Sequence, residues 1–225
     1  YGERMLEGIQ AKKYTYGFKK PADFSDKFET KLIGDFNSYN ALAVYAAAIL
    51  LGEDKEKVKE ILKTVEPPKG RFNYVKSESG VIGIVDYAHS PDALENVLQT
   101  IVRMREGKQK IISVFGCGGD RDPVKRPIMG RISAELADIS IFTSDNPRTE
   151  DPTKIINQMQ TDLTNELKQK VKIIPDRRQA INEAVKIAEP GDYILLAGKG
   201  HEDYQEVNGV KTHFDDTEEL EKAFD

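Results

Sequence analysis

Short apolar stretches alternate with amphipathic stretches through most of the chain, and this alternation limits the possible folds more than any other feature. Five apolar stretches predict buried strands, at residues 80–88, 110–116, 138–144, 171–175 and 192–198. Between them lie four stretches with the apolar spacing of helices, at residues 90–107, 126–137, 151–169 and 176–191. Continuously apolar strands separated by helices indicate a parallel sheet covered on both faces. We therefore expect a doubly wound α/β unit.

The sequence before and after this alternation predicts further elements. An alanine-rich buried helix is expected at residues 37–52 and an amphipathic helix at 54–65, whereas residues 1–28 are typical of short strands or irregular chain. The stretch "EPPKGRF", residues 66–72, breaks all periodicity and is the best linker candidate. After the last strand we expect a hairpin that turns at Asn208-Gly209, and then a closing helix at 216–224. These patterns predict two domains, residues 1–67 and 68–225.

Composition excludes several kinds of protein. The net charge of −5 comes from interspersed charges with no dominant basic tract, which argues against nucleic acid as the main partner. No apolar run approaches the ~20 residues of a transmembrane helix. Cys117 is the single cysteine, so no internal disulfide is possible, as suits a cytoplasmic protein. The opening "YGERMLEGIQ" has neither an initiator Met nor the apolar segment of a signal peptide, and we expect a fragment of a longer protein.

The loops that follow the predicted strands hold most of the unusual residues. Ligands of doubly wound sheets bind beyond the carboxyl ends of the strands. The loops there are "DYAHSPD", "FGCGGDRDPVKRP", "SDNPRTEDP" and "AGKGHEDYQ". The guanidinium groups of Arg121 and Arg148, together with the carboxylate of Glu202, would suit a zwitterionic amino acid. Alternatively, each arginine is solvated or paired with a neighbouring aspartate.

Two common nucleotide motifs do not match these loops. "FGCGGDRD" places Arg121 where the dinucleotide fingerprint needs its last glycine. "AGKGHE" is not a Walker A loop, because Lys199 is followed by Gly200, and no Walker A sequence occurs elsewhere. If the protein uses ATP, its phosphate loop lies outside this fragment. Cys117 is interpreted as a packing residue, and His213 as a surface residue or helix cap.

Taken in order, several stretches resemble the Mur ligases of peptidoglycan synthesis, and within them the MurE type, which adds the third peptide residue. They are "GDFNSYNALAVYAAA", "PPKGRF", "DYAHSPDALE", "FGCGGDRDPVKRPIMG", "TSDNPRTEDP", "DRRQAI" and "AGKGHEDYQ". The resemblance implies the helical end of a central α/β ATPase domain, followed by a complete Rossmann-like C-terminal domain. It also implies ATP and Mg²⁺ as cofactors. The Walker loop, the magnesium ligands and a carbamylated lysine would lie upstream, so no metal ligand is assigned here.

The resemblance also implies roles for individual residues. "DNPR", residues 145–148, resembles the signature that selects meso-diaminopimelate, with Arg148 gripping the distal carboxylate. The implied amino-acid-binding set is Arg121, Asp145, Asn146, Arg148, Gly198 and Glu202. The implied nucleotide-binding set is Asn37 and Asn40 near the adenine, Arg71 and Asp86 at the phosphates and ribose, and Tyr87, His89 and Ser90 beside them. Arg71 is also the implied catalytic residue.

The implied reaction is ATP-dependent amide formation. The D-glutamate γ-carboxylate of UDP-MurNAc-L-Ala-D-Glu becomes an acyl phosphate, and the amine of meso-diaminopimelate attacks it. The protein is expected to be a monomer, with no nucleic-acid partner and no membrane insertion. The sequence leaves open a close isostere such as lanthionine, a folylpolyglutamate synthetase-like ligase, and a non-catalytic amino-acid-binding module.

Overall fold

The computed structural model describes residue 4 and residues 6–225. The chain divides into two compact units, Tyr1–Glu66 and Pro67–Asp225, and each is described by itself. No helix in the described part of the chain is long and apolar enough to cross a membrane.

The N-terminal unit is built on two helices, α2 (Asp35–Leu50) and α3 (Lys55–Thr64). Asp54 caps α3, because its carboxylate accepts the Lys57 N–H at 2.9 Å. Both predicted helices are confirmed. Ahead of α2 the described residues form one isolated bridge, between Tyr16 and Phe24, and are otherwise irregular. Apolar residues of the two helices and of this irregular segment form the core, namely Leu42, Tyr45, Val58, Leu62, Phe18, Phe24 and Phe28.

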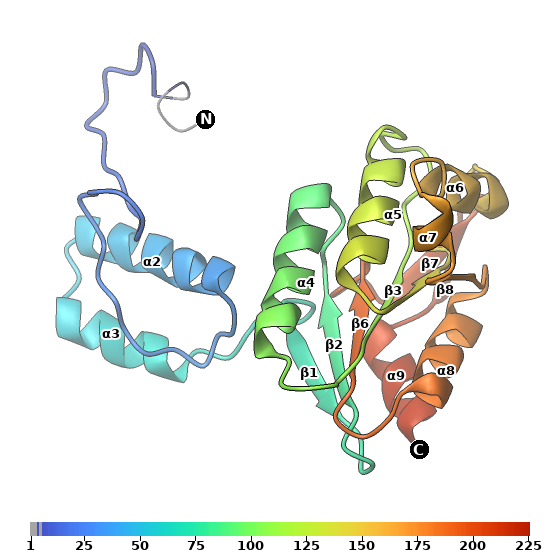
Figure 1. Ribbon diagram of the computed structural model, residues 1–225. Helices are drawn as coiled ribbons and strands as arrows, with labels where there is room; N and C mark the ends of the chain where they lie inside the picture. The colour runs from blue at the N-terminus through green and yellow to red at the C-terminus, as the bar shows by residue number, and fades with distance from the viewer. Residues whose placement is uncertain (1–3, 5) are drawn as a thin grey trace. The chain divides into compact units, whose positions relative to one another are not determined.

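The C-terminal unit contains a six-stranded sheet in the order β1-β2-β6-β3-β4-β5 (Figure 1). Its strands are β1 (Asn73–Lys76), β2 (Ile82–Asp86), β3 (Ile111–Phe115), β4 (Ile139–Phe142), β5 (Val171–Ile173) and β6 (Tyr193–Ala197). All neighbours are parallel except β1, which runs antiparallel to β2. The expected doubly wound, mostly parallel sheet is confirmed. The edge strand β1 was not predicted, because only alternate residues of its four are half-buried and it directly follows the linker stretch.

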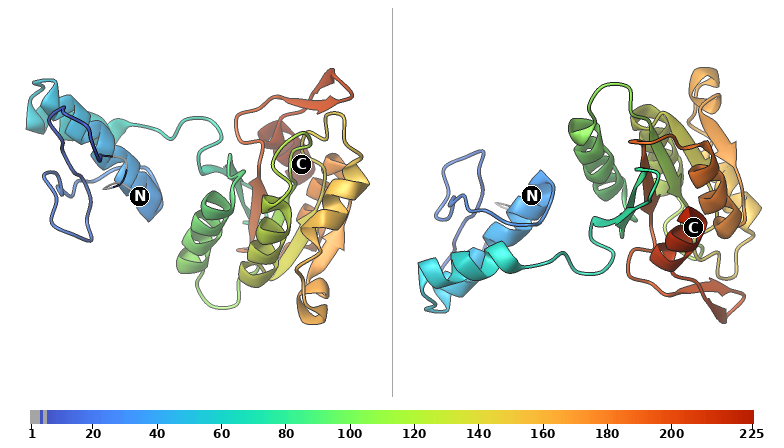
Figure 2. Two further views of the ribbon diagram at one scale, coloured as in Figure 1. Left: turned by 90° about the horizontal axis from the view of Figure 1, so that it is seen from above. Right: turned by 90° about the horizontal axis from the view of Figure 1, so that it is seen from below.

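Helices cover both faces of this sheet (Figure 2). On one face α4 (Pro91–Met104) packs beside α5 (Lys125–Leu136), and on the other α8 (Arg177–Ile187) packs beside α9 (Asp216–Phe224). Ser90 caps α4 and Asp176 caps α8, each through a hydrogen bond from a first-turn N–H to its side chain. Between the sheet and the second helix pair lies a core cluster that includes Val85, Ile112, Val114, Ile141, Ala180, Ile181, Ile194, Leu196 and Leu220.

The single helix predicted at residues 151–169 is wrong. The structure has two shorter helices there, α6 (Pro152–Met159) and α7 (Asn165–Lys168). Thr164 ends the continuity, because its hydroxyl accepts the Leu167 N–H at 3.3 Å and so starts a new helix. Polar capping of this kind competes with a continuous helix while leaving the apolar spacing unchanged.

A hairpin extends from the end of β6 and is formed by β7 (Tyr204–Val207) and β8 (Val210–His213). Asn208 and Gly209 both have positive φ, 49° and 78°, as a two-residue turn of this hand requires. The predicted turn is confirmed. β7 also makes an isolated bridge through Val207 to Arg148, so the hairpin reaches the loop that follows β4.

Candidate active site

The carboxyl ends of four neighbouring parallel strands meet at one edge of the sheet. Asp86 at the end of β2 and Phe115 at the end of β3 both pair with Ala197 of β6, and Phe115 also pairs with Phe142 of β4. The loops that start at this edge carry the residues predicted to bind an amino acid, namely Arg121, Asp145, Asn146, Arg148, Gly198 and Glu202. The register of the sheet thus brings these loops side by side.

The loops after β3 and β4 are packed backbone against backbone. A Cβ atom on Gly119 would lie 1.9 Å from the Pro147 oxygen, so only glycine fits at position 119. The Gly119 N–H donates to the backbone oxygen of Asn146 at 2.8 Å. At Gly118 a Cβ atom would lie 3.0 Å from Arg148 Nη1 and 3.7 Å from Arg121 Cγ. The close approach therefore sets both arginine side chains around Gly118.

Arg148 is held firmly at its backbone. Its φ of 51° is unfavourable for a non-glycine residue and persists only when the surroundings fix it. The hairpin supplies this restraint through two backbone hydrogen bonds. The Arg148 N–H donates to the backbone oxygen of Glu206 at 3.0 Å, and the Asn208 N–H donates to the backbone oxygen of Arg148 at 2.7 Å. Arg148 Nη1 donates to the Gly119 oxygen at 2.7 Å, and the side chain stays 19% exposed. The guanidinium is therefore fixed in place but still accessible.

Asn146 and Glu202 form a polar pair that joins the loop after β4 to the loop after β6. Asn146 Nδ2 donates to Glu202 Oε2 at 2.8 Å, and the Glu206 N–H donates to Asn146 Oδ1 at 2.9 Å. Behind the pair lies Lys199, whose side chain is fully buried. Burial raises the pKa of Asp145, while the neighbouring Lys199 lowers it. Lys199 was not predicted to belong to the site, although its position between two glycines and close to acidic residues was a usable signal.

A second buried cation, Arg126, forms hydrogen bonds to the same loops. Arg126 of α5 donates to both carboxylate oxygens of Glu150, at 2.9 and 2.7 Å, and to the Gly118 oxygen at 3.1 Å. Glu150 Oε1 also accepts the Asp120 N–H at 2.6 Å. The Arg126 guanidinium, together with that N–H, lowers the pKa of Glu150 to about 2. This pair was not predicted, and it fixes the glycine-rich loop on which Arg121 and Arg148 depend.

Five of the residues predicted to bind a nucleotide, Arg71, Asp86, Tyr87, His89 and Ser90, lie at or near the end of β2. The guanidinium carbon of Arg71 lies 5.3 Å from the centroid of the Tyr87 ring. His89 and His201 lie against the same ring, with centroid distances of 4.5 and 4.8 Å. Ser90 caps α4, so its hydroxyl accepts the Ala93 N–H at 3.4 Å. An exposed cation therefore stands beside a group of aromatic rings, an arrangement that suits a phosphate and a base.

The linker segment that carries Arg71 is docked onto the C-terminal unit. The Tyr87 N–H donates to the Gly70 oxygen at 2.8 Å, and Lys69 Nζ pairs with Asp215 Oδ2 at 2.5 Å. A Cβ atom on Gly70 would lie 2.2 Å from the His201 nitrogen, so the linker touches the "AGKGHE" loop directly. Asp86 Oδ2 accepts the Phe72 N–H at 2.8 Å. These contacts tie Arg71 to the loop that bears Glu202.

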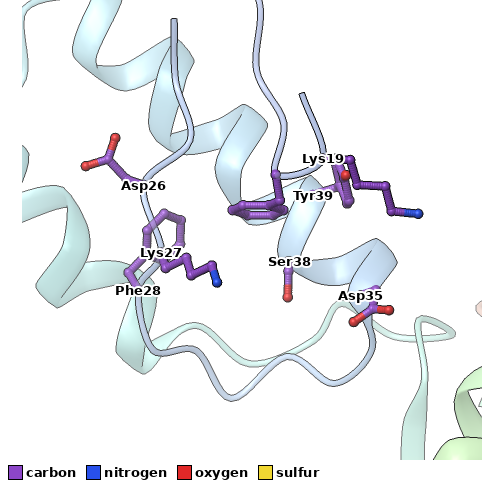
Figure 3. A pocket seen from close by; sticks show the side chains of 8 residues that line it. Lys19, Asp26, Lys27, Phe28, Asp35, Ser38 and Tyr39 are labelled. Carbon is purple, nitrogen blue, oxygen red and sulfur yellow. The ribbon is translucent and has the colours of Figure 1, made fainter. Parts of the chain in front are cut away.

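Asn37 and Asn40, predicted near the adenine, belong to the N-terminal unit. Asn37 is buried, and its Nδ2 donates to the Ile33 oxygen at 2.8 Å. Asn40 Nδ2 donates to Asn37 Oδ1 at 3.3 Å. A cavity of about 390 Å³ lies at the same end of α2 (Figure 3). Its lining comes from the first turns of α2 and from the irregular segment before it, and comprises Phe18, Lys19, Asp26, Lys27, Phe28, Asp35, Ser38 and Tyr39.

The described part of the chain holds no group of three or more His, Cys, Asp or Glu side chains that could bind a metal ion. Cys117 is buried beside Met129, and burial raises the pKa of its thiol to about 12. It is therefore an unreactive packing residue, as predicted.

A family model described as "Mur ligase, glutamate ligase domain" matches residues 70–200. The chain belongs to the Mur ligase family. A similar relative, the UDP-N-acetylmuramoyl-L-alanyl-D-glutamate–2,6-diaminopimelate ligase of Parabacteroides distasonis, is 48% identical over 98% of this chain and 49% of its own length. The ligase of the same name from Lactiplantibacillus plantarum is 50% identical over 86% of this chain and 38% of its own length. This Mur ligase chain spans about half the length of the curated relatives it matches.

Solved structures agree with this assignment. One described as a UDP-N-acetylmuramoyl-L-alanyl-D-glutamate–2,6-diaminopimelate ligase is 35% identical, with a TM-score of 0.66 over 99% of this Mur ligase chain and 50% of its own. A Mycobacterium tuberculosis folylpolyglutamate synthase matches 75% of this chain and 38% of its own, with a TM-score of 0.60 and 20% identity. The second likeness shows a shared fold alone.

The buried carboxyl of Asp86 gives this Mur ligase chain a pH-dependent stability. Burial raises the pKa of Asp86 from 3.8 to about 6, although the Phe72 N–H and Arg71 lower it. The native state then binds this proton more tightly than the unfolded chain, so the free energy of unfolding falls as pH rises from 3.8 to about 6. Asp86→Asn should lack this loss. The free energy of unfolding of the variant, measured by urea denaturation and compared with that of the wild type, should therefore increase by up to about 3 kcal/mol between pH 4 and pH 7.5. An equal difference at both pH values would contradict this expectation.

Proposed function

We propose that this chain is the amino-acid-binding part of an ATP-dependent ligase that joins meso-diaminopimelate to UDP-MurNAc-L-Ala-D-Glu. The observation that carries the proposal is the arrangement around Gly118, where the side chains of Arg121 and Arg148 lie beside the backbone oxygen of Asn146. The side-chain amide of the same Asn146 donates to Glu202 at 2.8 Å. The distal end of diaminopimelate carries one carboxylate and one ammonium group. The Arg148 guanidinium suits the carboxylate and the Glu202 carboxylate suits the ammonium. Arg121, Asp145, Asn146 and Gly198 would complete this site.

The two units have different proposed roles. Residues 1–67 would form the end of a central ATP-binding domain, and residues 68–225 would form the amino-acid-binding domain. The names of the similar relatives support the proposed substrates, since they describe a ligase of UDP-N-acetylmuramoyl-L-alanyl-D-glutamate and 2,6-diaminopimelate. We further propose that the ligase is monomeric and cytoplasmic and that it has no nucleic-acid partner.

The nucleotide-side residues fit ATP as the second ligand. The exposed Arg71 guanidinium is held over the Tyr87 ring, where it could neutralise phosphate charge while the aromatic rings offer flat contact surfaces. His89 and Ser90 would flank the nucleotide, Asp86 would orient the linker through Phe72, and Asn37 and Asn40 would approach the adenine. When bound, ATP supplies the phosphoryl group that activates the carboxylate, and Mg²⁺ neutralises its phosphates. We expect the ligands of Mg²⁺ outside this chain.

The proposed function can be tested with a full-length ligase that contains this chain. Purified enzyme is supplied with UDP-MurNAc-L-Ala-D-Glu, ATP, Mg²⁺ and one amino acid at a time, and phosphate release and the peptide product are measured. Diaminopimelate should be joined efficiently and L-lysine poorly, because lysine has no distal carboxylate. Turnover of lanthionine would show how strictly the site requires the distance between the two ends of diaminopimelate. Joining of glutamate to a folate, without use of the UDP-linked dipeptide, would overturn the proposal.

Arg71→Ala should affect chemistry more than folding. The Arg71 side chain is exposed and contributes little to the core, so the melting temperature should hardly change. Loss of one charge-assisted contact to phosphate should lower kcat about 10- to 100-fold. Lys76→Ala, which removes another exposed cation on β1, serves as the control and should keep normal turnover. Near-normal kcat in Arg71→Ala would show that Arg71 is only a solvated linker charge.

A further inference from the structure

Lys199 places a buried ammonium group at the centre of the loops described above. Its side chain is fully buried, and its Nζ donates to the Tyr204 backbone oxygen and, at 3.3 Å, to Asn146 Oδ1. Two carboxylates complete its surroundings: Asp145 Oδ1 lies 3.6 Å away and Glu202 Oε2 lies 3.7 Å away. One cation thus joins the loop after β4, its own loop after β6 and the start of β7.

Lys199 helps to fix the orientation of the Asn146 side-chain amide. Asn146 Oδ1 faces two donors, the Lys199 ammonium and the Glu206 backbone N–H. A flipped amide would set its own NH₂ group against both of these donors, which is unfavourable. The Nδ2 group is therefore directed at Glu202 Oε2, 2.8 Å away. In this way the buried lysine also determines how Glu202 is held.

Lys199 also balances the charge of this group. Asp145 and Glu202 both lie within 4 Å of the same ammonium nitrogen. Two neighbouring carboxylates repel each other, and a cation within 4 Å of both offsets this repulsion. The lysine therefore stabilises the arrangement in which Glu202 stays beside Asn146 and Asp145.

We propose that Lys199 is a positioning residue, which holds the side chains of Asn146 and Glu202 in the geometry that recognises the amino group of the incoming amino acid. The side chain is inaccessible, so it acts through these two residues and does not touch the substrate. This inference rests on the proposed function, because it assigns a role in that same amino-acid site.

The test measures KM values for the incoming amino acid and for ATP in a full-length ligase that contains this chain. Lys199→Met should raise the KM for the amino acid about 10-fold or more and leave the KM for ATP almost unchanged. Lys211→Met is the matched control, because Lys199 Nζ and Lys211 Nζ both lie near the Tyr204 ring, 5.7 and 3.9 Å from its centroid, but Lys211 is on an exposed strand. Its KM values should stay at the wild-type level. A purely structural role would lower stability without separating the two KM values.

A double-mutant cycle with Glu202→Gln tests whether Lys199 affects amino-acid binding through Glu202. If Lys199 acts through Glu202, Lys199→Met should cost little more once Glu202 is already replaced. If Lys199→Met alone does not fold, Lys199→Met/Asp145→Asn removes a buried cation and a buried anion together. The same separation of KM values is then expected relative to Asp145→Asn.

The outcomes distinguish this inference from the proposed function. Diaminopimelate turnover by the wild type, with an unchanged amino-acid KM in Lys199→Met or additive costs in the cycle, would overturn the role of Lys199 alone. A wild type that accepts a different amino acid would overturn the substrate assignment, and the Lys199 variants are then measured with the amino acid it accepts. A wild type that joins no amino acid would overturn both.

Discussion

Arg148→Ala should impair the use of meso-diaminopimelate far more than the use of ATP. The Arg148 guanidinium is held by the Gly119 backbone oxygen and by Glu206 Oε2, 3.8 Å from its Nε, and the hairpin holds its backbone on both sides. Removing one partner of a desolvated charge pair costs about 2–5 kcal/mol, which is roughly a 30-fold to several-thousand-fold loss. The ratio of kcat/KM for diaminopimelate to that for L-lysine measures the effect, and it should fall by this factor.

Two further variants separate the side chain of Arg148 from its backbone. Glycine adopts positive φ without strain, so Arg148→Gly should lose the same discrimination while keeping the loop conformation. Arg148→Lys keeps the charge but loses the planar fork, and it should recover only part of the activity. Equal losses for diaminopimelate and L-lysine in Arg148→Ala would identify Arg148 as a structural turn residue and remove the main support for the substrate assignment.

Arg177→Met should strongly destabilise the C-terminal unit. Arg177 donates to both oxygens of Asp216 at 2.7 Å and to the Ala197 oxygen at 3.0 Å, and both charged side chains are fully buried. The substitution would leave a buried aspartate without its cation, at a cost of about 3–5 kcal/mol. For a unit of this size that cost corresponds to a fall in melting temperature of roughly 6–20 °C. Thermal unfolding followed by circular dichroism measures it.

The neighbouring residue provides a matched control for this prediction. Arg178 pairs with the buried Glu219, but the Arg178 side chain is 59% exposed and Lys222 Nζ also lies 3.2 Å from Glu219 Oε1. Glu219 therefore keeps one cation in Arg178→Met, which should cost less than about 1 kcal/mol. The double variant Arg177→Met/Asp216→Leu removes the ion pair as a whole and should recover most of the lost stability. If Arg177→Met melts at the wild-type temperature, the pair does not stabilise the native state.

The sheet and its helices were predictable because their signals are local. Continuously apolar strands and regularly spaced apolar helix faces are visible within a window of a few residues, as is the Asn208-Gly209 turn. The missed features had no such signal. The strand β1 lies at the sheet edge and buries only half of its residues, and the break between α6 and α7 depends on a single capping hydroxyl. The strand β1 is defined by its backbone hydrogen bonds to β2, and the helix break by the Thr164 cap, and neither changes the apolar pattern of the sequence.

The candidate site was partly predictable for a topological reason. Loops that follow parallel strands share one edge of the sheet, so Arg121, Arg148 and Glu202 could be expected in one crevice. The buried ion pairs near these loops could not be predicted, because the two partners of each pair are distant in sequence. Arg126 and Glu150 are 24 residues apart, and Arg177 and Asp216 are 39 apart. Only the folded chain shows that these charges are paired, and that Lys199 is buried at all.

The buried thiol of Cys117 makes this protein convenient for site-specific labelling. The chain has no other cysteine, and maleimide dyes react with exposed thiolates. A thiol with a pKa of about 12 inside the core should therefore stay unlabelled while the protein is folded. One cysteine introduced on the exposed surface of α3 and another on the exposed strand β8 would then carry a fluorescent donor and acceptor. Energy transfer between the dyes would measure the separation of the two units in this chain, without first removing its native cysteine.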